Sequence, residues 1–156
     1  MRDSKKVSNI VWDGMSRKQH NKIARYIQSM AATLGLREWN LKLMDEFTAE
    51  DGDENALMTI QIVPGRHMGQ IRLAKDFNSF PYKDKKQAII HELVHCHQQK
   101  LLLWADDTLR EVLGTVGYEI FNAAYRDNFE HMVDDLAVVF ARVIDDSPAK
   151  HLLKGN

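Results

Sequence analysis

The stretch His91-Glu92-Leu93-Val94-His95 decides how this chain is organised. On a helix, residues i and i+4 lie on the same face with their Cβ atoms about 6 Å apart. Two imidazoles in that arrangement can hold one zinc ion at nitrogen–metal distances of about 2.0–2.1 Å. Glu92 follows the first histidine directly, where its carboxylate can take a proton from a water held at that metal. The pattern therefore predicts two metal ligands and a general base within about one turn of helix.

The residues around this motif favour a helix from about 84 to 104. Asp84 and Gln87 have the spacing of a capping box, and apolar residues follow at helical spacing. No glycine or proline occurs between Pro81 and Gly114. An alternative interpretation is an amphipathic helix whose two histidines are simply buried and hydrogen-bonded.

The composition is that of an ordinary globular chain. Its 156 residues predict one domain over 1–156, with an arm at 1–13 and a frayed tail at 147–156. Hydrophobic residues make up 44% and charged residues 28%. With a net charge of −1 and a pI near 6.6, the chain has no overall positive charge that would attract nucleic acid or an anionic membrane.

Cysteine use and the apolar runs bear on the cellular compartment. The single cysteine, Cys96, excludes an internal disulfide and a zinc ribbon of paired cysteines. It is expected to be a small packed residue, although a thiol beside a metal site would be sensitive to oxidation. The run Ile10-Val11-Trp12 is too short for a signal peptide, and no stretch approaches the roughly 20 apolar residues that span a bilayer. We therefore expect a cytoplasmic protein without a membrane association.

Hydrophobic periodicity predicts the remaining elements. An apolar row ending at Gly35 predicts a first helix, and the acidic connection 46–55 reads as a solvated loop rather than a calcium site. The last helix is apolar almost all round and is therefore expected to be central. The pattern predicts an α+β fold, with a small, mainly antiparallel sheet packed against the motif helix and the C-terminal helices. Besides the motif helix, the predicted elements are helices at 16–34, 108–125 (begun by a capping box, Thr108 with Glu111) and 128–144, and strands at 39–44, 56–63 and 68–74.

A catalytic zinc ion usually takes a third protein ligand. Glu130 and Asp134 stand at i and i+4 on the apolar last helix, where a buried carboxylate is costly unless it is paired or metal-bound. We predict Glu130 as the third ligand and Asp134 as the acceptor of an N–H from a ligating imidazole. Two alternatives stay open. Glu130 could cap the helix with Asp127 as N-cap, or the ligand could be His131, Asp134 or Asp135.

Other polar residues have weaker functional signals. His97 is two residues past His95 and therefore points roughly 200° away around the helix, which indicates a surface or loop contact. Tyr118, Tyr125 and Arg126 precede the last helix, and each could polarise a substrate carbonyl as an oxyanion stabiliser. A structural role is the alternative for all three.

The motif, preceded by a strand and a polar turn and followed by Glu130-x-x-x-Asp134 on a later helix, resembles the gluzincin branch of zinc metallopeptidases. More narrowly, it is similar to the minimal SprT-like or phage-encoded members, over roughly residues 68–144. The resemblance implies that the strand 68–74 is the edge along which a polypeptide substrate lies. The roles that it implies are zinc ligands at His91, His95 and Glu130, a general base at Glu92 and a supporting carboxylate at Asp134.

The chain also departs from that pattern. It has no second domain to wall the cleft and no cysteine zinc ribbon, which leaves the substrate range and any association with DNA open. The single-domain ImmA-like regulators, which act on repressor proteins, are a neighbouring possibility.

The expected activity is zinc-dependent hydrolysis of peptide bonds. Zinc would lower the pKa of its bound water towards 7, and Glu92 would accept the proton and later return it to the leaving amine. One alternative is a non-catalytic, metal-stabilised binding or assembly module. Retention of Glu92 argues against it, because a purely structural site needs no base. A zinc hydrolase of a non-peptide amide or ester is the other alternative.

Overall fold

The computed structural model describes residues 15–47 and 56–154. The fold is α+β, as predicted. The predicted arm at 1–13 and most of the acidic connection lie outside the described residues. In chain order the elements are α1 (Arg17–Thr33), β1 (Asn40–Phe47), β2 (Met58–Ile62), β3 (Met68–Leu73), the short 3-10 helix η1 (Phe77–Ser79), α2 (Tyr82–Val143) and the 3-10 helix η2 (Lys150–Leu152).

The three strands form a mixed sheet in the order β1-β3-β2. β1 pairs with β3 in parallel, whereas β2 pairs with β3 antiparallel, so the prediction of a mainly antiparallel sheet holds for one of the two pairings. β3 is the central strand, because both of its edges are already hydrogen-bonded. The prediction that strand 68–74 is a free edge for a substrate is therefore wrong, and β2 forms an edge of the sheet instead.

Helix α1 begins and ends where local sequence rules place its ends. The amide of Gln19 donates to Ser16 Oγ at 3.3 Å, and Gln19 Oε1 accepts from the Ser16 amide at 3.0 Å, which completes a capping box. Gly35 follows the helix with φ 79°, a left-handed conformation that suits glycine. The first predicted helix is confirmed.

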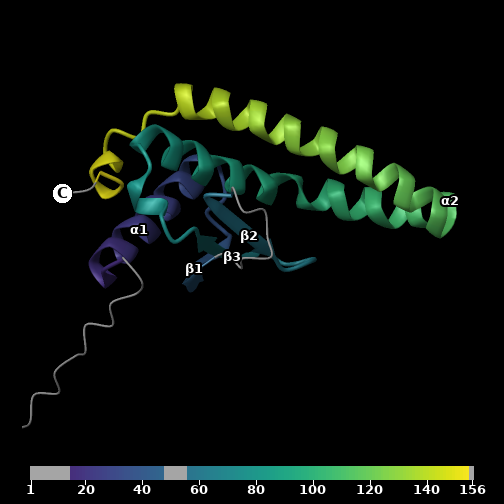
Figure 1. The fold of residues 1–156 in the computed structure, drawn as a ribbon, viewed down its shortest axis with the longest axis horizontal. Helices are drawn as coiled ribbons and strands as arrows, with labels where there is room; N and C mark the ends of the chain where they lie inside the picture. Colours follow the sequence, from purple (N-terminus) through teal and green to yellow (C-terminus); the bar gives the residue numbers. More distant parts are fainter. Residues whose placement is uncertain (1–14, 48–55, 155–156) are drawn as a thin grey trace, which may run out of the picture.

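The three helices predicted after the sheet form one run, α2, which is broken at Gly114. Gly114 has φ 64° and ψ 179°, a region that essentially only glycine occupies. This residue divides α2 into a first arm (82–113) and a second arm (115–143), which lie side by side as a hairpin (Figure 1). The predicted capping boxes at Asp84 and Thr108 are wrong, because α2 begins at Tyr82 and Thr108 lies inside the first arm.

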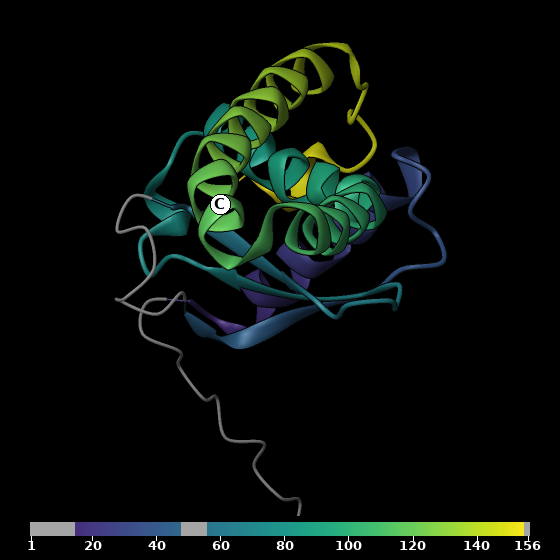
Figure 2. The ribbon, with the colours of Figure 1, turned by 90° about the vertical axis from the view of Figure 1, so that its right-hand side faces the viewer.

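The first arm lies between the second arm and the sheet (Figures 1 and 2). One hydrophobic cluster joins α1, the sheet and the first arm, and a second cluster joins the two arms. The second arm is therefore not central as predicted: it packs through one face, and Met132, Val139 and Val143 on other faces are exposed. Within the described residues, no helix combines the length and the apolar character that a membrane crossing requires.

The C-terminal segment is fastened to the beginning of α2. Ala149 and Leu153 belong to the main core, so the prediction of a frayed tail is wrong for residues 149–153. Buried Asp146 accepts a hydrogen bond from the Tyr26 hydroxyl at 2.5 Å and another from Tyr82, and it lies 3.1 Å from Lys86 Nζ. Burial, together with Asp146, raises the pKa of Tyr26 and keeps its hydroxyl a donor.

We predict that Asp146→Ala destabilises the protein by about 3–5 kcal/mol, because it leaves the Lys86 ammonium buried without its counter-charge. The free energy of unfolding, measured by denaturant titration, checks this. Asp145→Ala is the matched control, since Asp145 is exposed and accepts hydrogen bonds from Ser147. Equal effects of the two substitutions would contradict the inferred role of Asp146.

Candidate metal centre

Each arm of the hairpin carries an apolar row and, one residue further along the chain, a polar row. A step of one residue turns the helix by about 100°, so each polar row flanks its apolar row on the adjacent face. Contact between the apolar rows therefore brings the polar rows together beside it. The apolar rows are Ile90 and Val94 on the first arm and Phe129, Val133 and Ala137 on the second; the polar rows are His91 and His95, and Glu130 and Asp134.

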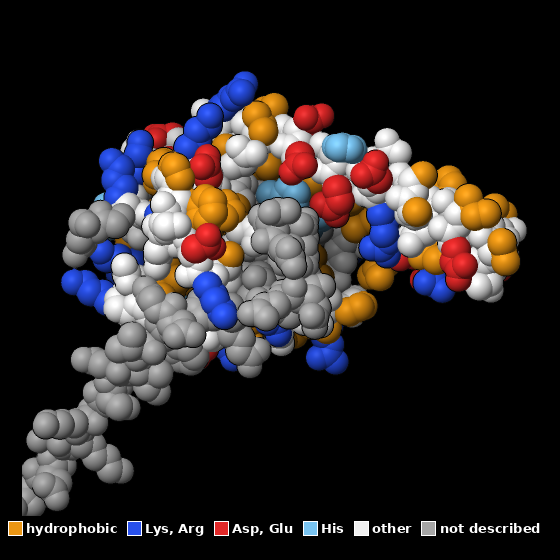
Figure 3. All heavy atoms as spheres, in the orientation of Figure 1, with side chains coloured by type: hydrophobic (Ala, Val, Ile, Leu, Met, Phe, Trp, Pro, Cys, Tyr) orange, Lys and Arg blue, Asp and Glu red, His pale blue; other side chains and the backbone are white. Residues whose placement is uncertain are grey.

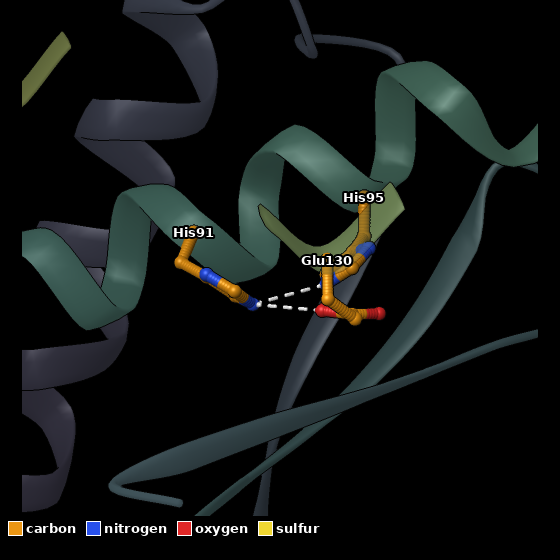
Figure 4. Close-up of side chains that lie close together, drawn as sticks. All are labelled: His91, His95 and Glu130. Carbon is orange, nitrogen blue, oxygen red and sulfur yellow. Dashed lines mark hydrogen bonds and ion pairs between the residues drawn. The ribbon is translucent and has the colours of Figure 1, made fainter. Parts of the chain in front are cut away.

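Three of these polar side chains converge on one point (Figure 4). Glu130 Oε2 lies 3.5 Å from His91 Nε2 and 3.4 Å from His95 Nε2, and the two imidazole nitrogens are 3.1 Å apart. Ligands of a tetrahedral zinc ion, each about 2.0–2.1 Å from the metal, are separated from one another by about 3.3 Å. The three spacings thus fit three corners of such a tetrahedron. In the described part of the chain, this is the one group whose donor atoms are arranged to hold a metal ion.

Asp134 supports the centre through the other nitrogen of His91. Its Oδ1 lies 2.9 Å from His91 Nδ1, which holds the proton on Nδ1 and directs the Nε2 lone pair towards Glu130 and His95. The apolar character of the last helix predicted that both carboxylates are buried. That prediction is wrong, because the Glu130 and Asp134 side chains are 55% and 60% exposed.

Glu92 is buried between the motif helix and the sheet. Its Oε2 accepts a hydrogen bond from the backbone N–H of Ile60 in β2 at 3.0 Å. Burial raises the pKa of Glu92 to about 8, a rise that the Ile60 hydrogen bond opposes and the charge of Glu130 reinforces. The carboxyl group is therefore oriented by the edge strand, and its raised pKa shifts it towards the protonated form.

Two neighbours of the centre are also affected by burial. Burial lowers the pKa of His95, while the charge of Glu130 opposes that shift and His91 reinforces it. A lowered pKa favours the neutral imidazole, which is the form that binds metals. Burial raises the pKa of the Cys96 thiol to about 12, with a further contribution from Glu92. Cys96 is thus a packed, protonated thiol and not the oxidation-sensitive residue that its position suggested.

The centre opens into a cavity of about 530 Å³. Glu92 lines the same cavity as His91 and Glu130, so the base and the candidate ligands face one common space. The other walls come from the sheet side (Ala56, Leu57, Met58), from the start of the first arm (Asp84, Gln87, Ala88) and from Asp134. The strand at 56–63 was predicted, but its edge position and the contact of the Ile60 amide with Glu92 were not, because a backbone contact between residues 60 and 92 leaves no pattern in the side chains.

Of the alternative ligands, Asp134 contacts the Nδ1 of His91 instead, and His131 and Asp135 are not part of the cluster. His131 is exposed and faces Asp127 at 3.7 Å along the same helix, and Asp135 is exposed. Glu130 cannot form a capping box with Asp127, because both residues lie inside the second arm. His97 Nε2 donates to the Leu34 carbonyl at 2.7 Å, the loop contact expected from its direction.

The structure does not bring the proposed oxyanion residues into the cavity. Tyr118 is buried in the distal part of the hairpin, with the Arg110 guanidinium 4.1 Å from its ring centre. Tyr125 stacks with Phe121 and packs against the cluster between the arms. Arg126 pairs with Asp106 at 3.1 Å and so joins the two arms.

No protein-family model, curated protein sequence or solved structure matches this chain. The resemblance to gluzincins and to SprT-like peptidases therefore remains a prediction, carried by the motif residues and by the arrangement of the two arms.

We predict that His95→Ala abolishes stoichiometric zinc binding, because two remaining protein ligands hold the ion poorly. Metal content after equilibration with zinc and gel filtration checks this. His97→Ala is the matched control, since His97 lies two residues away and contacts the α1–β1 loop. Full zinc occupancy in the His95 variant would refute the proposed centre.

Asp134→Ala should weaken zinc binding by about 10–100-fold without abolishing it, because the imidazole of His91 loses the partner that orients it. Competition with a fluorescent chelator gives the affinity. Asp135→Ala removes an equally exposed carboxylate from the adjacent position and should leave the affinity unchanged. Equal losses in both variants would indicate a general effect of negative charge.

Proposed function

We propose that this protein is a zinc-dependent peptidase. The observation that carries the proposal is that Glu92 lines the same open cavity as His91 and Glu130, two members of a group of three donor atoms with tetrahedral spacing. A structural zinc site closes its fourth position with another side chain, whereas a catalytic site leaves that position open. Here the group consists of His91, His95 and Glu130, and two of its members, His91 and Glu130, line a cavity large enough for part of a substrate.

Zinc held by these three residues would supply Lewis-acid activation of water and of a carbonyl group at neutral pH. Glu92 acts as the general base: it takes a proton from the attacking water and returns it to the amine nitrogen that leaves. The Ile60 amide holds one carboxylate oxygen of Glu92, which leaves the other oxygen for proton transfer. Asp134 keeps His91 in the tautomer that a metal ligand requires.

The proposed substrate is an extended polypeptide bound beside β2. Alternate residues of an antiparallel strand direct their backbone groups to the same side. The Ile60 amide points away from β3 to Glu92, so the backbone groups of Met58 point to that side as well. Met58 lines the cavity, where it could pair with a peptide backbone by strand addition. We propose the cytoplasm as the compartment, in line with a single, buried cysteine.

Glu92→Gln should retain zinc and lower the hydrolysis of a denatured protein substrate by about 10²–10⁴-fold, because an amide cannot act as a base. The rate of peptide-bond cleavage and the zinc content are measured on the same preparation. Glu119→Gln, at an exposed glutamate of the second arm, is the control and should retain full activity.

Two other outcomes of this experiment would contradict the proposed peptidase. Loss of zinc in the Glu92 variant would make Glu92 a ligand and contradict the mechanism. Zinc binding by the wild-type protein without cleavage of any polypeptide would favour the metal-stabilised binding module or a hydrolase of non-peptide amides.

A further inference from the structure

Two adjacent lysines at the start of α2 are both buried, but only one has a partner within the part of the chain that the structure describes. Lys85 and Lys86 are 5% and 7% exposed. The Lys86 ammonium lies 3.1 Å from Asp146 and donates to the Ile144 carbonyl at 2.9 Å. Lys85 has no hydrogen-bond or ion-pair partner among the described residues. A buried ammonium without a counter-charge is costly, and burial lowers the pKa of Lys85 accordingly.

Lys85 lines a cavity of about 300 Å³, on the side of the fold where α1, η1 and the C-terminal segment meet. Three further lysines line the same cavity, Lys18 and Lys22 from α1 and Lys154 from the C-terminal segment, and no acidic residue is among the described residues of its lining. Ser16, Gln19 and Asn78 add polar side chains. Figure 3 shows Lys and Arg side chains gathered around this end of the molecule. Lys85, Lys18 and Lys154 place like charges around one small space, which is unfavourable unless an anion occupies it.

The N-terminus of α1 lies at this cavity, where Ser16, Lys18 and Gln19 belong to the lining. The capping box uses the N–H groups of Ser16 and Gln19, and those of Arg17 and Lys18 have no partner among the residues that the structure describes. The first turn of α1 carries no acidic residue that would neutralise the positive end of the helix dipole. Helix N-termini with free N–H groups bind phosphate and related anions.

We propose that this cavity is a binding site for a phosphate group, with Lys85 as its buried counter-charge. A phosphate dianion offers several acceptor oxygens to donors that approach from different directions, which suits lysines from α1, α2 and the chain end. The cavity volume and the depth of Lys85 favour a free phosphate or a terminal phosphate monoester. The phosphodiester of a nucleic acid is flanked on both sides and would not reach Lys85. The site is distinct from the candidate metal centre, with which it shares no lining residue.

The test uses the full chain freed of metal by a chelator, so that the candidate metal centre makes no contribution. Inorganic phosphate, glycerol phosphate and an oligonucleotide without terminal phosphates are titrated separately by calorimetry. Wild-type protein should bind the first two at one saturable site. Lys85→Met and the double variant Lys18→Ala/Lys154→Ala should each weaken binding at least about tenfold. Lys100→Met, at an exposed lysine of the first arm, is the matched control and should bind like wild type.

Thermal unfolding provides an independent readout. Phosphate should raise the unfolding temperature of the wild-type protein, because a ligand stabilises the state that binds it. Lys85→Met should lose this rise yet unfold no earlier than wild type in phosphate-free buffer, since it removes an unpaired buried charge.

Absence of saturable phosphate binding would overturn the proposal. So would binding that survives in both lysine variants, or binding of the oligonucleotide but not of inorganic phosphate. If Lys85→Met fails to fold, the double variant at Lys18 and Lys154, whose side chains lie at the cavity rim, decides the question.

Discussion

The apolar contact between the two arms of α2 is the interaction on which the candidate centre depends. Ile90 and Val94 meet Phe129, Val133 and Ala137, and each large side chain that becomes buried contributes about 1.5–3 kcal/mol. The polar contacts beside this row are half-exposed, and exposed ion pairs contribute only about 0–1 kcal/mol. The apolar rows therefore set the register of the two arms, and this register determines where the imidazoles and carboxylates lie.

The buried ionisable residues of the described chain differ in whether they form an ion pair. Lys86 and Asp146 satisfy each other and fasten the chain end to the start of α2, which is a structural use of charge. Glu92 and Lys85 are also buried, but each lines a cavity. A lone buried charge costs free energy that the fold must offset elsewhere, so such residues point to a ligand or a reaction. Both proposals above arise from charges of this second kind.

Local rules predicted part of the fold correctly. Helix α1 and its glycine end, the three strands and the direction of His97 follow from periodicity and end signals over fewer than about 20 residues. The errors came from features that depend on distant partners. Apolar residues all round the last helix predicted a central element, yet one face of it packs and Val139 and Val143 stay exposed. Burial of Glu130 and Asp134 was assumed for the same reason, and they instead border an open cavity.

The sequence by itself determined the chemistry available on one turn of helix. Four-residue spacing places His91 and His95 on one face wherever a helix forms, and Glu92 necessarily lies beside them. Only the tertiary structure decided what joins them. Glu130 is 35 residues beyond His95, and its approach requires the reversal at Gly114 and the packed register of the arms. The strand order was likewise decided by the tertiary structure. β1 pairs with one side of β3 and β2 with the other, so β2 is an edge strand, and its Ile60 amide donates a hydrogen bond to Glu92. Helical spacing is a property of the backbone. The register of the two arms and the order of the strands depend instead on the burial of side chains that are distant in sequence.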